Sequence, residues 1–381
     1  MMGAHASALL AAGARVTIVA GRGRAVPRGV RLVRIPEVSS THPAVLRDLR
    51  ALARGQIASD HARLVARLVR ALAPVVRRAD VVVAHNVLTM HKSLALVEAL
   101  AALARTASAR VIAWTHDIAW LDPRYAAERH PGDPWDLIAR PIPHVRYVAV
   151  SVERARQLKR LFGTRTRVDI VSNGIDLSAR LGLSPAGARL AERLGLGDAE
   201  PLLLLPARLT RRKRIEVAID ALAALRRRWP KAALVITGSP GPHNVANAEY
   251  ARELAQRAAR TNGVHLLHAH GIRPSDRVMT DLFSLADAVV LPSQDEGFGI
   301  PVLEAGAHGV PVICSDLETL RALAGEGATY VDPTADGAAI AAAIERRLRS
   351  DPVALLRRRA KQHAWPAILR EHVVPLILGR R

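Results

Sequence analysis

The sequence predicts an α/β fold built from two doubly wound domains, each with a parallel sheet covered by helices. Three observations carry this prediction. The chain has 381 residues, more than one domain usually contains. Half of its residues are hydrophobic, so each domain can bury a core of its own. Short β-branched runs alternate along the chain with longer amphipathic stretches, which is typical of parallel sheets covered on both faces.

Short apolar runs in the first half are expected to be strands, with Ala-, Leu- and Arg-rich helices between them. The predicted strands are Arg15–Ala20, Val30–Ile35, Asp80–Ala84, Val111–Trp114, Arg146–Val150 and Val168–Val171, and a helix is predicted over Glu153–Leu161. The chain opens on Met1–His5 and runs into a helix. The strand that normally begins a doubly wound domain is therefore missing from the predicted order.

The second half repeats the alternation. Its predicted strands are Leu202–Leu205, Ala233–Thr237, Val264–Leu267, Ala288–Leu291, Val310–Cys314 and Thr329–Val331. Its predicted helices are Ile215–Arg228, Glu249–Arg260, Asp276–Ala286, Pro301–His308 and Asp336–Arg349.

The domain boundary is predicted near Asn173–Asp176, because Asn-Gly marks a turn and a polar connector, Leu181–Asp198, follows it. We therefore expect one domain over residues 1–175 and a second over 176–362. A last helix is expected over about 363–381, with a break at Pro366, and we expect that it can pack on the first domain.

Composition excludes several classes of protein. The single cysteine, Cys314, rules out a disulfide within the chain and a zinc site built on cysteines, and it fits a reducing cytoplasm. The sequence has no apolar run long enough for a transmembrane helix and no basic start or cleavage site of a signal peptide. We therefore expect a cytoplasmic protein.

The formal net charge of +21 has two interpretations. It attracts phosphate groups of nucleotides, lipids or nucleic acids, or it reflects arginine drift in a GC-rich coding sequence. Aromatic residues make up only 3% of the chain, so a stacking platform for single-stranded nucleic acid is absent and no nucleic-acid partner is expected. Basic helices such as Arg63–Arg70 and Arg346–Arg359 leave peripheral contact with an anionic inner membrane face open, although solvated helix faces are the favoured interpretation.

The segment Glu296–Ala305 carries the clearest chemical signal. It follows a predicted buried strand, and its glycines allow close approach of the backbone to a ligand. Pro301 suits the first turn of a helix, whose free N–H groups and positive dipole end fit a diphosphate. Glu304 stands about one turn into that helix, where it can accept hydrogen bonds from ribose hydroxyls, and Glu296 can do the same for a hexose. An ordinary strand–loop–helix with two surface glutamates is the alternative.

A second motif, Pro206–Arg214, follows the first predicted strand of the second domain. It places Arg208 and Lys213 at the carboxyl end of that strand, the edge at which open parallel sheets bind ligands. An arginine offers a planar fork to a phosphate and a lysine a point charge. A solvated basic loop is the alternative.

Taken together, these motifs resemble the family 4 glycosyltransferases, a retaining group with the GT-B fold. The family has two glutamates separated by seven residues, here Glu296 and Glu304, and an Arg and a Lys that match Arg208 and Lys213. A glycine usually follows that Lys, whereas this chain has Arg214. The resemblance covers residues from about 151 to 333, and it implies two Rossmann-like domains that face each other across a cleft.

The resemblance also implies roles for individual residues. The catalytic candidates are His116, Arg208, Lys213 and Glu296. The donor-binding candidates are Arg208, Lys213, Gly238, Glu296, Gly297, Phe298, Gly299, Ile300 and Glu304. The acceptor-side candidates are Gly3, in a remnant of the family's first glycine-rich loop, and His85 and Asn86, at the end of a strand.

The implied activity is transfer of a hexose, with retention, from a nucleotide-diphosphate sugar to a hydroxyl of a glycan, lipid-linked or small-molecule acceptor. No metal and no cofactor are expected. Three other interpretations stay open: a non-catalytic or truncated GT-B relative, a polyanion-binding protein, and a sugar-nucleotide epimerase, which shares the two-domain architecture.

Overall fold

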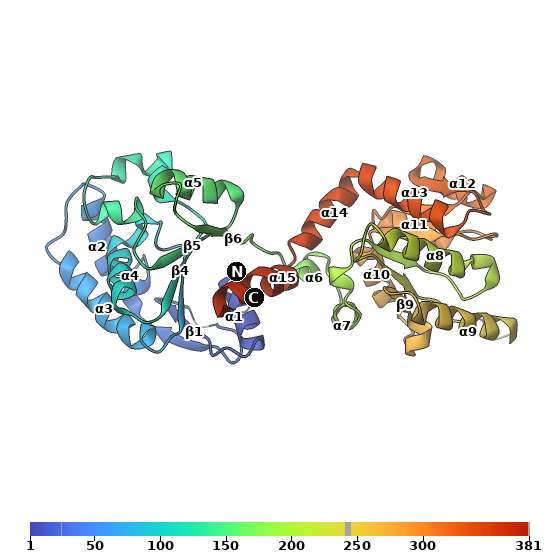
Figure 1. Cartoon of the computed structure of the whole chain (residues 1–381), viewed down its shortest axis with the longest axis horizontal. Helices are drawn as coiled ribbons and strands as arrows, with labels where there is room; N and C mark the ends of the chain where they lie inside the picture. Colours follow the sequence, from blue (N-terminus) through green and yellow to red (C-terminus); the bar gives the residue numbers. More distant parts are fainter. Residues whose placement is uncertain (24, 241–244, 380–381) are drawn as a thin grey trace. The chain divides into compact units, whose positions relative to one another are not determined.

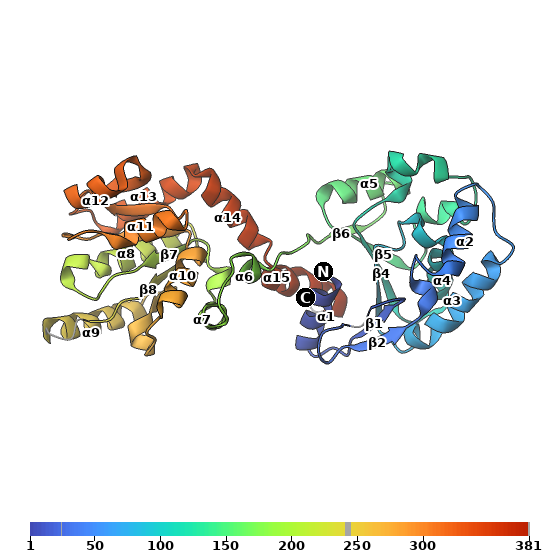
Figure 2. The same cartoon turned by 180° about the vertical axis from the view of Figure 1, so that it is seen from behind.

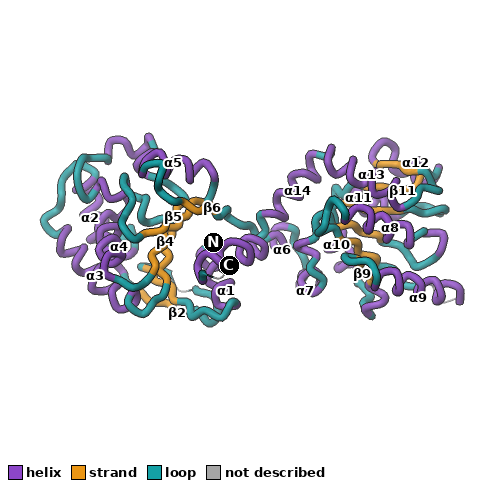
Figure 3. Tube along the Cα trace, in the orientation of Figure 1, coloured by secondary structure: helices purple, strands orange, loops and turns teal. Residues whose placement is uncertain are grey.

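The computed structural model describes residues 1–23, 25–240 and 245–379. The chain divides into unit 1, which consists of Met1–Gly174 and Trp365–Arg381, and unit 2, which is Ile175–Ala364. In each unit the strands form a middle layer between helices (Figure 3). The predicted α/β class with two parallel-sheet domains is therefore confirmed, and the predicted boundaries lie within two residues of this division. That the domains face each other across a cleft stays a prediction.

Unit 1 contains a four-stranded parallel sheet of order β3-β4-β5-β6 and a separate parallel pair, β1-β2. Its strands are β1 Thr17–Ala20, β2 Arg31–Arg34, β3 Val81–His85, β4 Arg110–Thr115, β5 Val145–Ala149 and β6 Val168–Ile170. Its helices are α1 Met2–Ala11, α2 Pro43–Leu52, α3 His61–Val76, α4 Leu94–Thr106, α5 Val152–Phe162, α15 Trp365–Ile368 and α16 Val374–Leu378. A π-helical turn, Leu369–Val373, joins the last two.

The β1-β2 pair belongs to the same layer as the larger sheet although no hydrogen bonds join them. Val19 of β1 and Val82 of β3 pack against one core cluster, whereas Val16 and Val81 pack against another that includes the C-terminal helices. Among the described residues, no strand pairs with both β1 and β3. Over the described residues, the layer is therefore interrupted between β1 and β3.

The C-terminal segment completes the core of unit 1. Ile368, Val373 and Ile377 are buried against Ile112 and Trp114 of β4. Arg110 donates a hydrogen bond of 2.7 Å from Nη2 to the carbonyl oxygen of Ile377. Both views show α15 and its continuation beside α1, so that the two ends of the chain lie close together (Figures 1 and 2).

Unit 2 is a six-stranded parallel sheet of order β12-β11-β10-β7-β8-β9. Its strands are β7 Leu202–Leu205, β8 Ala233–Ile236, β9 Val264–Leu266, β10 Ala288–Leu291, β11 Val312–Ser315 and β12 Ala328–Val331. Its helices are α6 Leu177–Arg180, α7 Pro185–Arg193, α8 Ile215–Arg226, α9 Val245–Ala259, α10 Asp276–Leu285, α11 Ile300–Ala307, α12 Glu318–Ala324, α13 Gly337–Ser350 and α14 Pro352–Gln362. Strands β7, β8, β10 and β11 are buried along their whole length, because helices cover both faces of the sheet.

The expected polar connector, Leu181–Asp198, is wrong as a description of this segment. Half of it is helix α7, whose first turn is capped by Ser184 and has Pro185 at its start. Leu190 and Leu196 are buried in the core of unit 2 beside β7 and β8. The Gly and Pro punctuation therefore marks the ends of a packed helix rather than a loop.

The strand order of unit 2 reverses at β7. The chain moves from β7 outward to β8 and β9, and then returns to place β10 on the other side of β7. In open parallel sheets the loops on either side of such a reversal diverge and leave a crevice at the carboxyl ends of the strands. The loops after β7 and β10 are the two segments that carry the motifs described above. Over the part of the chain that the structure describes, none of the helices has the length and apolarity needed to cross a bilayer.

Candidate functional site

Lys213 is the best-defined cation at the reversal point of unit 2. It ends the short 3-10 turn Arg211–Lys213 that follows β7, and its side chain is only 11% exposed. Its Nζ forms an ion pair with Oε1 of Glu296, whose side chain is 8% exposed. The two motifs that the sequence placed at neighbouring strand ends therefore meet in a buried ion pair.

Glu296 is held by further contacts between the loops. The hydroxyl of Ser293 donates to Oε1 of Glu296 over 3.1 Å. The backbone N–H of Gln294 donates to the carbonyl oxygen of Arg212 over 2.8 Å, and Nη1 of Arg212 donates to the carbonyl oxygen of Asp295 over 2.9 Å. These contacts leave Oε2 of Glu296 without a protein partner among the described residues.

Arg208 lies on the same loop as Lys213 but is exposed, and among the described residues its guanidinium has no hydrogen-bond or ion-pair partner. Its backbone is fixed by the loop after β8. A Cβ atom on Gly238 would lie 1.8 Å from the carbonyl oxygen of Ala207, so only glycine permits this approach. The N–H of Leu209 donates to the carbonyl oxygen of Ser239 over 3.2 Å. Arg208 is thus a free cation on a fixed backbone.

The glycine-edged turn before α11 behaves as its sequence predicts. Gly299 has a φ of 96° and caps the helix, a conformation that glycine adopts without penalty. Gly297 has no atom within 4 Å of an added Cβ, and Glu304 is exposed on the second turn of α11. Phe298 and Ile300 are 56% and 60% exposed, which is unusual for large apolar side chains.

Arg214, the departure from the family pattern, has a physical explanation. Its φ of 51° lies in the left-handed region, where a glycine costs nothing and other residues cost about 1–2 kcal/mol. Its guanidinium donates to the carbonyl oxygens of Pro333 and Ala335, the latter over 2.8 Å. The long side chain thereby joins the start of α8 to the turn before α13, a bond that glycine cannot make.

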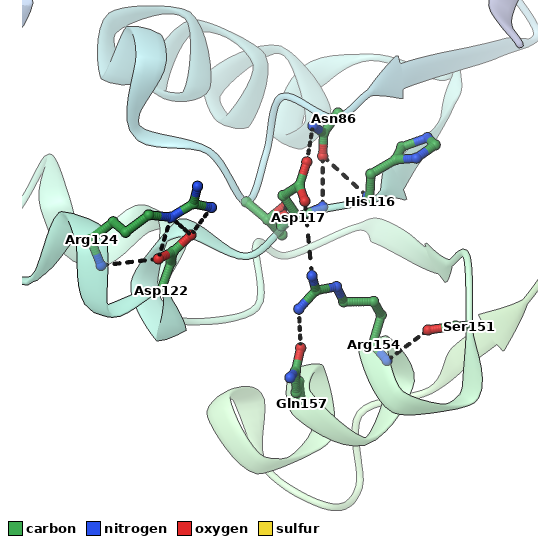
Figure 4. Close-up of polar contacts among 9 residues, drawn as sticks. Asn86, His116, Asp117, Asp122, Arg124, Ser151, Arg154 and Gln157 are labelled. Atoms are coloured by element: carbon green, nitrogen blue, oxygen red, sulfur yellow. Dashed lines mark hydrogen bonds and ion pairs between the residues drawn. The ribbon is translucent and has the colours of Figure 1, made fainter.

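In unit 1, Asn86 organises the segment that follows β4. Its φ of 52° is one that Asn tolerates better than most residues. Its Oδ1 accepts the backbone N–H groups of His116 and Asp117 over 3.1 and 3.0 Å, and its Nδ2 donates to Oδ2 of Asp117 over 3.0 Å (Figure 4). Burial lowers the pKa of His116, so its imidazole is neutral near pH 7.

His85 occupies a different environment from its neighbour Asn86. Its ring lies 5.2 Å from that of His5 and 5.8 Å from that of Trp114. Burial lowers the pKa of His85 to about 4 and that of His5 to about 3. His85 is therefore an uncharged member of an aromatic cluster beneath α1.

The expectation that Gly3 belongs to a glycine-rich loop is wrong. Gly3 lies in the first turn of α1, Met2–Ala11, with nothing within 4 Å of an added Cβ. The alanines and leucines that follow it favour a helix strongly enough to include this glycine.

The structure therefore groups the predicted residues into two sets. Unit 2 brings together Arg208, Lys213, Gly238, Glu296 and the turn 297–304, while unit 1 carries His116, His85 and Asn86. Sequence reasoning missed Ser293, which donates to Glu296, and Asp117, which is hydrogen-bonded to Asn86; no pattern distinguishes them from other polar residues at strand ends. Within the described residues, no group of three or more His, Cys, Asp or Glu side chains is placed to hold a metal ion.

Comparison with known proteins adds a second kind of observation. Residues 188–364 match the family described as "Glycosyl transferases group 1". The chain is 35% identical over 187 residues to a D-inositol 3-phosphate glycosyltransferase of Nocardia farcinica, which covers 48% of this chain and 40% of the relative. It is 32% identical over 238 residues to a GDP-mannose-dependent alpha-(1-6)-phosphatidylinositol monomannoside mannosyltransferase of Mycolicibacterium smegmatis, covering 59% of this chain and 57% of the relative.

A third relative is a glycogen synthase of Mycobacterium tuberculosis, which is 32% identical over 263 residues, with 66% of this chain and 59% of the relative covered. The chain thus spans between 40% and 59% of the length of these three relatives. The family match lies within unit 2, the unit that holds the Lys213–Glu296 pair.

Proposed function

We propose, because residues 188–364 match the family "Glycosyl transferases group 1", that this chain is a retaining glycosyltransferase that moves a hexose from a nucleotide-diphosphate sugar to an acceptor hydroxyl. One observation carries the proposal. At the reversal point of the unit 2 sheet, a buried Lys213–Glu296 pair, an unpartnered Arg208 and the start of α11 lie on the loops that follow adjacent strands.

The arrangement suits a sugar diphosphate. Arg208 and the N–H groups at the start of α11 offer donors to the two phosphates. Lys213 adds a positive charge close by, although part of it is already balanced by Glu296. Oε2 of Glu296 accepts a hydrogen bond from a hydroxyl of the hexose, and the carboxylate of Glu304 accepts hydrogen bonds from the ribose hydroxyls. Phe298 and Ile300 provide exposed apolar surface next to these polar groups.

The proposed step requires charge stabilisation more than proton transfer by the protein. The bond between the anomeric carbon and the phosphate oxygen breaks, and the nucleoside diphosphate leaves with the electron pair. The acceptor oxygen forms its bond to the anomeric carbon on the same face, and its proton passes to the departing phosphate oxygen. Fixed cations at the position where this negative charge grows lower the barrier. The neutral imidazole of His116 is proposed to contact the transferred sugar.

We propose that the protein's own cations carry this role without a metal or another cofactor. The relatives named above indicate the range of substrates. GDP-mannose is the donor in the name of one, and inositol phosphates and glycogen appear in the names of others. One of these names thus gives a hexose donor, and the inositol and glycogen of the others are polyhydroxylated molecules.

The test starts with binding and continues with turnover. A thermal-shift screen of the whole chain against nucleoside diphosphates and their hexoses should single out one base, since bound ligand stabilises the fold by RT ln(1 + [L]/Kd). With that donor, transfer should persist in the presence of a chelator, and nuclear magnetic resonance of the product should show the anomeric configuration of the donor. Absence of any stabilising nucleotide, or an inverted product, would contradict the proposal.

A further inference from the structure

Unit 1 contains a polar cavity of about 350 Å³ at the carboxyl ends of β4 and β5. This volume lies at the lower end of the range of about 300–1,000 Å³ that is typical of small-molecule sites. The polar side chains around it come from the segment after β4 and from the first two turns of α5 (Figure 4). They are those of Asp117, Asp122, Arg124, Tyr125, Arg154 and Gln157.

The backbone on one side of the cavity is fixed. Asn86 binds both the backbone and the side chain of Asp117, and the hydroxyl of Thr89 donates to the carbonyl oxygen of Asp117 over 2.7 Å. Asn86, which the sequence placed on the acceptor side, is therefore a positioning residue for Asp117. This support holds a carboxylate at the cavity rather than leaving it on a mobile loop.

The other side is fixed by α5. Ser151 caps this helix by accepting the backbone N–H of Arg154 over 3.1 Å. Nη1 of Arg154 donates to Oε1 of Gln157 over 2.6 Å, and its Nη2 lies 3.9 Å from Oδ1 of Asp117. The distance to Asp117 is too long for a direct hydrogen bond, so the guanidinium of Arg154 keeps donors available to a ligand.

The charges around the cavity balance. Two carboxylates, Asp117 and Asp122, face two guanidinium groups, Arg124 and Arg154, and Arg124 is already bound to Asp122 through two nitrogens. A phosphate would meet two like charges here, whereas a hydroxyl both donates to a carboxylate and accepts from a guanidinium or an amide. The cavity thus matches a neutral ligand with several hydroxyl groups.

We propose that this cavity binds a neutral polyhydroxylated molecule, a monosaccharide or a cyclitol, through Asp117, Arg154 and Gln157. The proposal rests on the proposed function, in which this ligand is the acceptor. It names a substrate class and a set of contacts that the donor motifs of unit 2 do not determine. It also separates Asn86, which holds Asp117, from the groups that contact the ligand.

Two variants and a matched control test the proposal. Asp117→Asn and Arg154→Gln each remove one charged partner. Arg156→Gln removes an exposed arginine on the same helix, whose ion pair is with Glu153. With free glucose, mannose and myo-inositol as probes, the best acceptor should show a KM raised about tenfold or more in the first two variants, the loss expected for a hydrogen bond to a charged group. The donor KM and donor hydrolysis should stay unchanged, and Arg156→Gln should behave like the unaltered chain.

The outcomes distinguish this proposal from the proposed function. If donor binding and hydrolysis persist while the acceptor KM changes less than twofold in both variants, the cavity is not the acceptor site and the glycosyltransferase proposal stands. If no donor binds, the glycosyltransferase proposal fails, and saturation-transfer resonance with the same polyols still tests the cavity on the whole chain. Binding of inorganic phosphate that is tighter than that of every polyol and weakened by Arg154→Gln would overturn the assignment of a neutral ligand.

Discussion

Replacing Lys213 with methionine should reduce both the stability of unit 2 and the rate of transfer, for two separable reasons. The side chains of Lys213 and Glu296 are 11% and 8% exposed, so this ion pair is shielded from water. Removing the ammonium leaves the Glu296 carboxylate buried with one remaining hydroxyl donor, Ser293. Breaking a buried pair from one side costs about 3–5 kcal/mol. The ratio of folded to unfolded protein should therefore fall by roughly a thousandfold.

The double variant Lys213→Met/Glu296→Gln separates the two effects. Replacing both members of a buried pair with neutral groups of similar size is often close to neutral, so most of the lost stability should return. The rate should not return, because the positive charge near the leaving diphosphate is still absent. Hydrogen exchange of the β7 and β10 amides, measured over a urea series, gives the stability of unit 2. The value of kcat reports whether the positive charge of Lys213 lowers the barrier of the transfer step.

Two results would refute this reasoning. A cost below about 1 kcal/mol for Lys213→Met would show that Glu296 is solvated or protonated after the change. Recovery of kcat in the double variant would show that Lys213 acts only by holding the fold.

Three further predictions concern other parts of the chain. Gly238→Ala should destabilise unit 2 by about 1–3 kcal/mol and raise the donor KM, because its Cβ would lie 1.8 Å from the carbonyl oxygen of Ala207, next to Arg208. Unchanged thermal unfolding and an unchanged donor KM would count against this prediction. Lys361→Met should cost about 3–5 kcal/mol in urea unfolding, since its Nζ lies 2.6 Å from the buried Oδ2 of Asp287; the double change with Asp287→Asn should restore part of this, and simple additivity would contradict the pairing. The hydrogen bond that His61 donates to the Asp48 carboxylate raises the pKa of His61 above 6.5, so the stability that His61 contributes is complete below pH 6.5 and is lost as the pH rises through the raised value. The difference in unfolding free energy between the unaltered chain and His61→Gln should therefore shrink from pH 6 to pH 9, and a constant difference would exclude this linkage.

The fold could be predicted from the sequence to a large extent, because apolar runs that are buried on both faces leave a clear local pattern. Each predicted strand overlaps a strand of the structure, with ends that differ by at most two residues. The prediction of a polar connector over 181–198 is wrong because Gly and Pro residues are also typical of helix ends, and here Ser184 and Pro185 start helix α7. That error is one of turn chemistry and not of hydrophobic pattern.

The candidate site was predictable in its parts but not in its contacts. Lys213 and Glu296 each follow an apolar strand, which places both at the same edge of the sheet. Neither motif predicts the strand order that makes β7 and β10 neighbours. Their ion pair joins residues 83 positions apart. The cavity in unit 1 could not be predicted from the sequence. Asp117 and Arg154 come from separate strand ends, and neither stands in a distinctive local sequence pattern.

The discontinuity of unit 1 has a consequence for how the polypeptide folds as it is synthesised. Unit 2 is one continuous segment, residues 175–364, whereas the layer of unit 1 that packs on β4 includes Ile368, Val373 and Ile377 from beyond unit 2. The ribosome makes the first 174 residues early, yet it must translate all of unit 2 before these three side chains exist. Although domains usually mature in the order of their translation, here the second to be made is the first that can be finished. Until translation reaches that point, the nascent N-terminal half exposes an apolar surface that chaperones would have to protect.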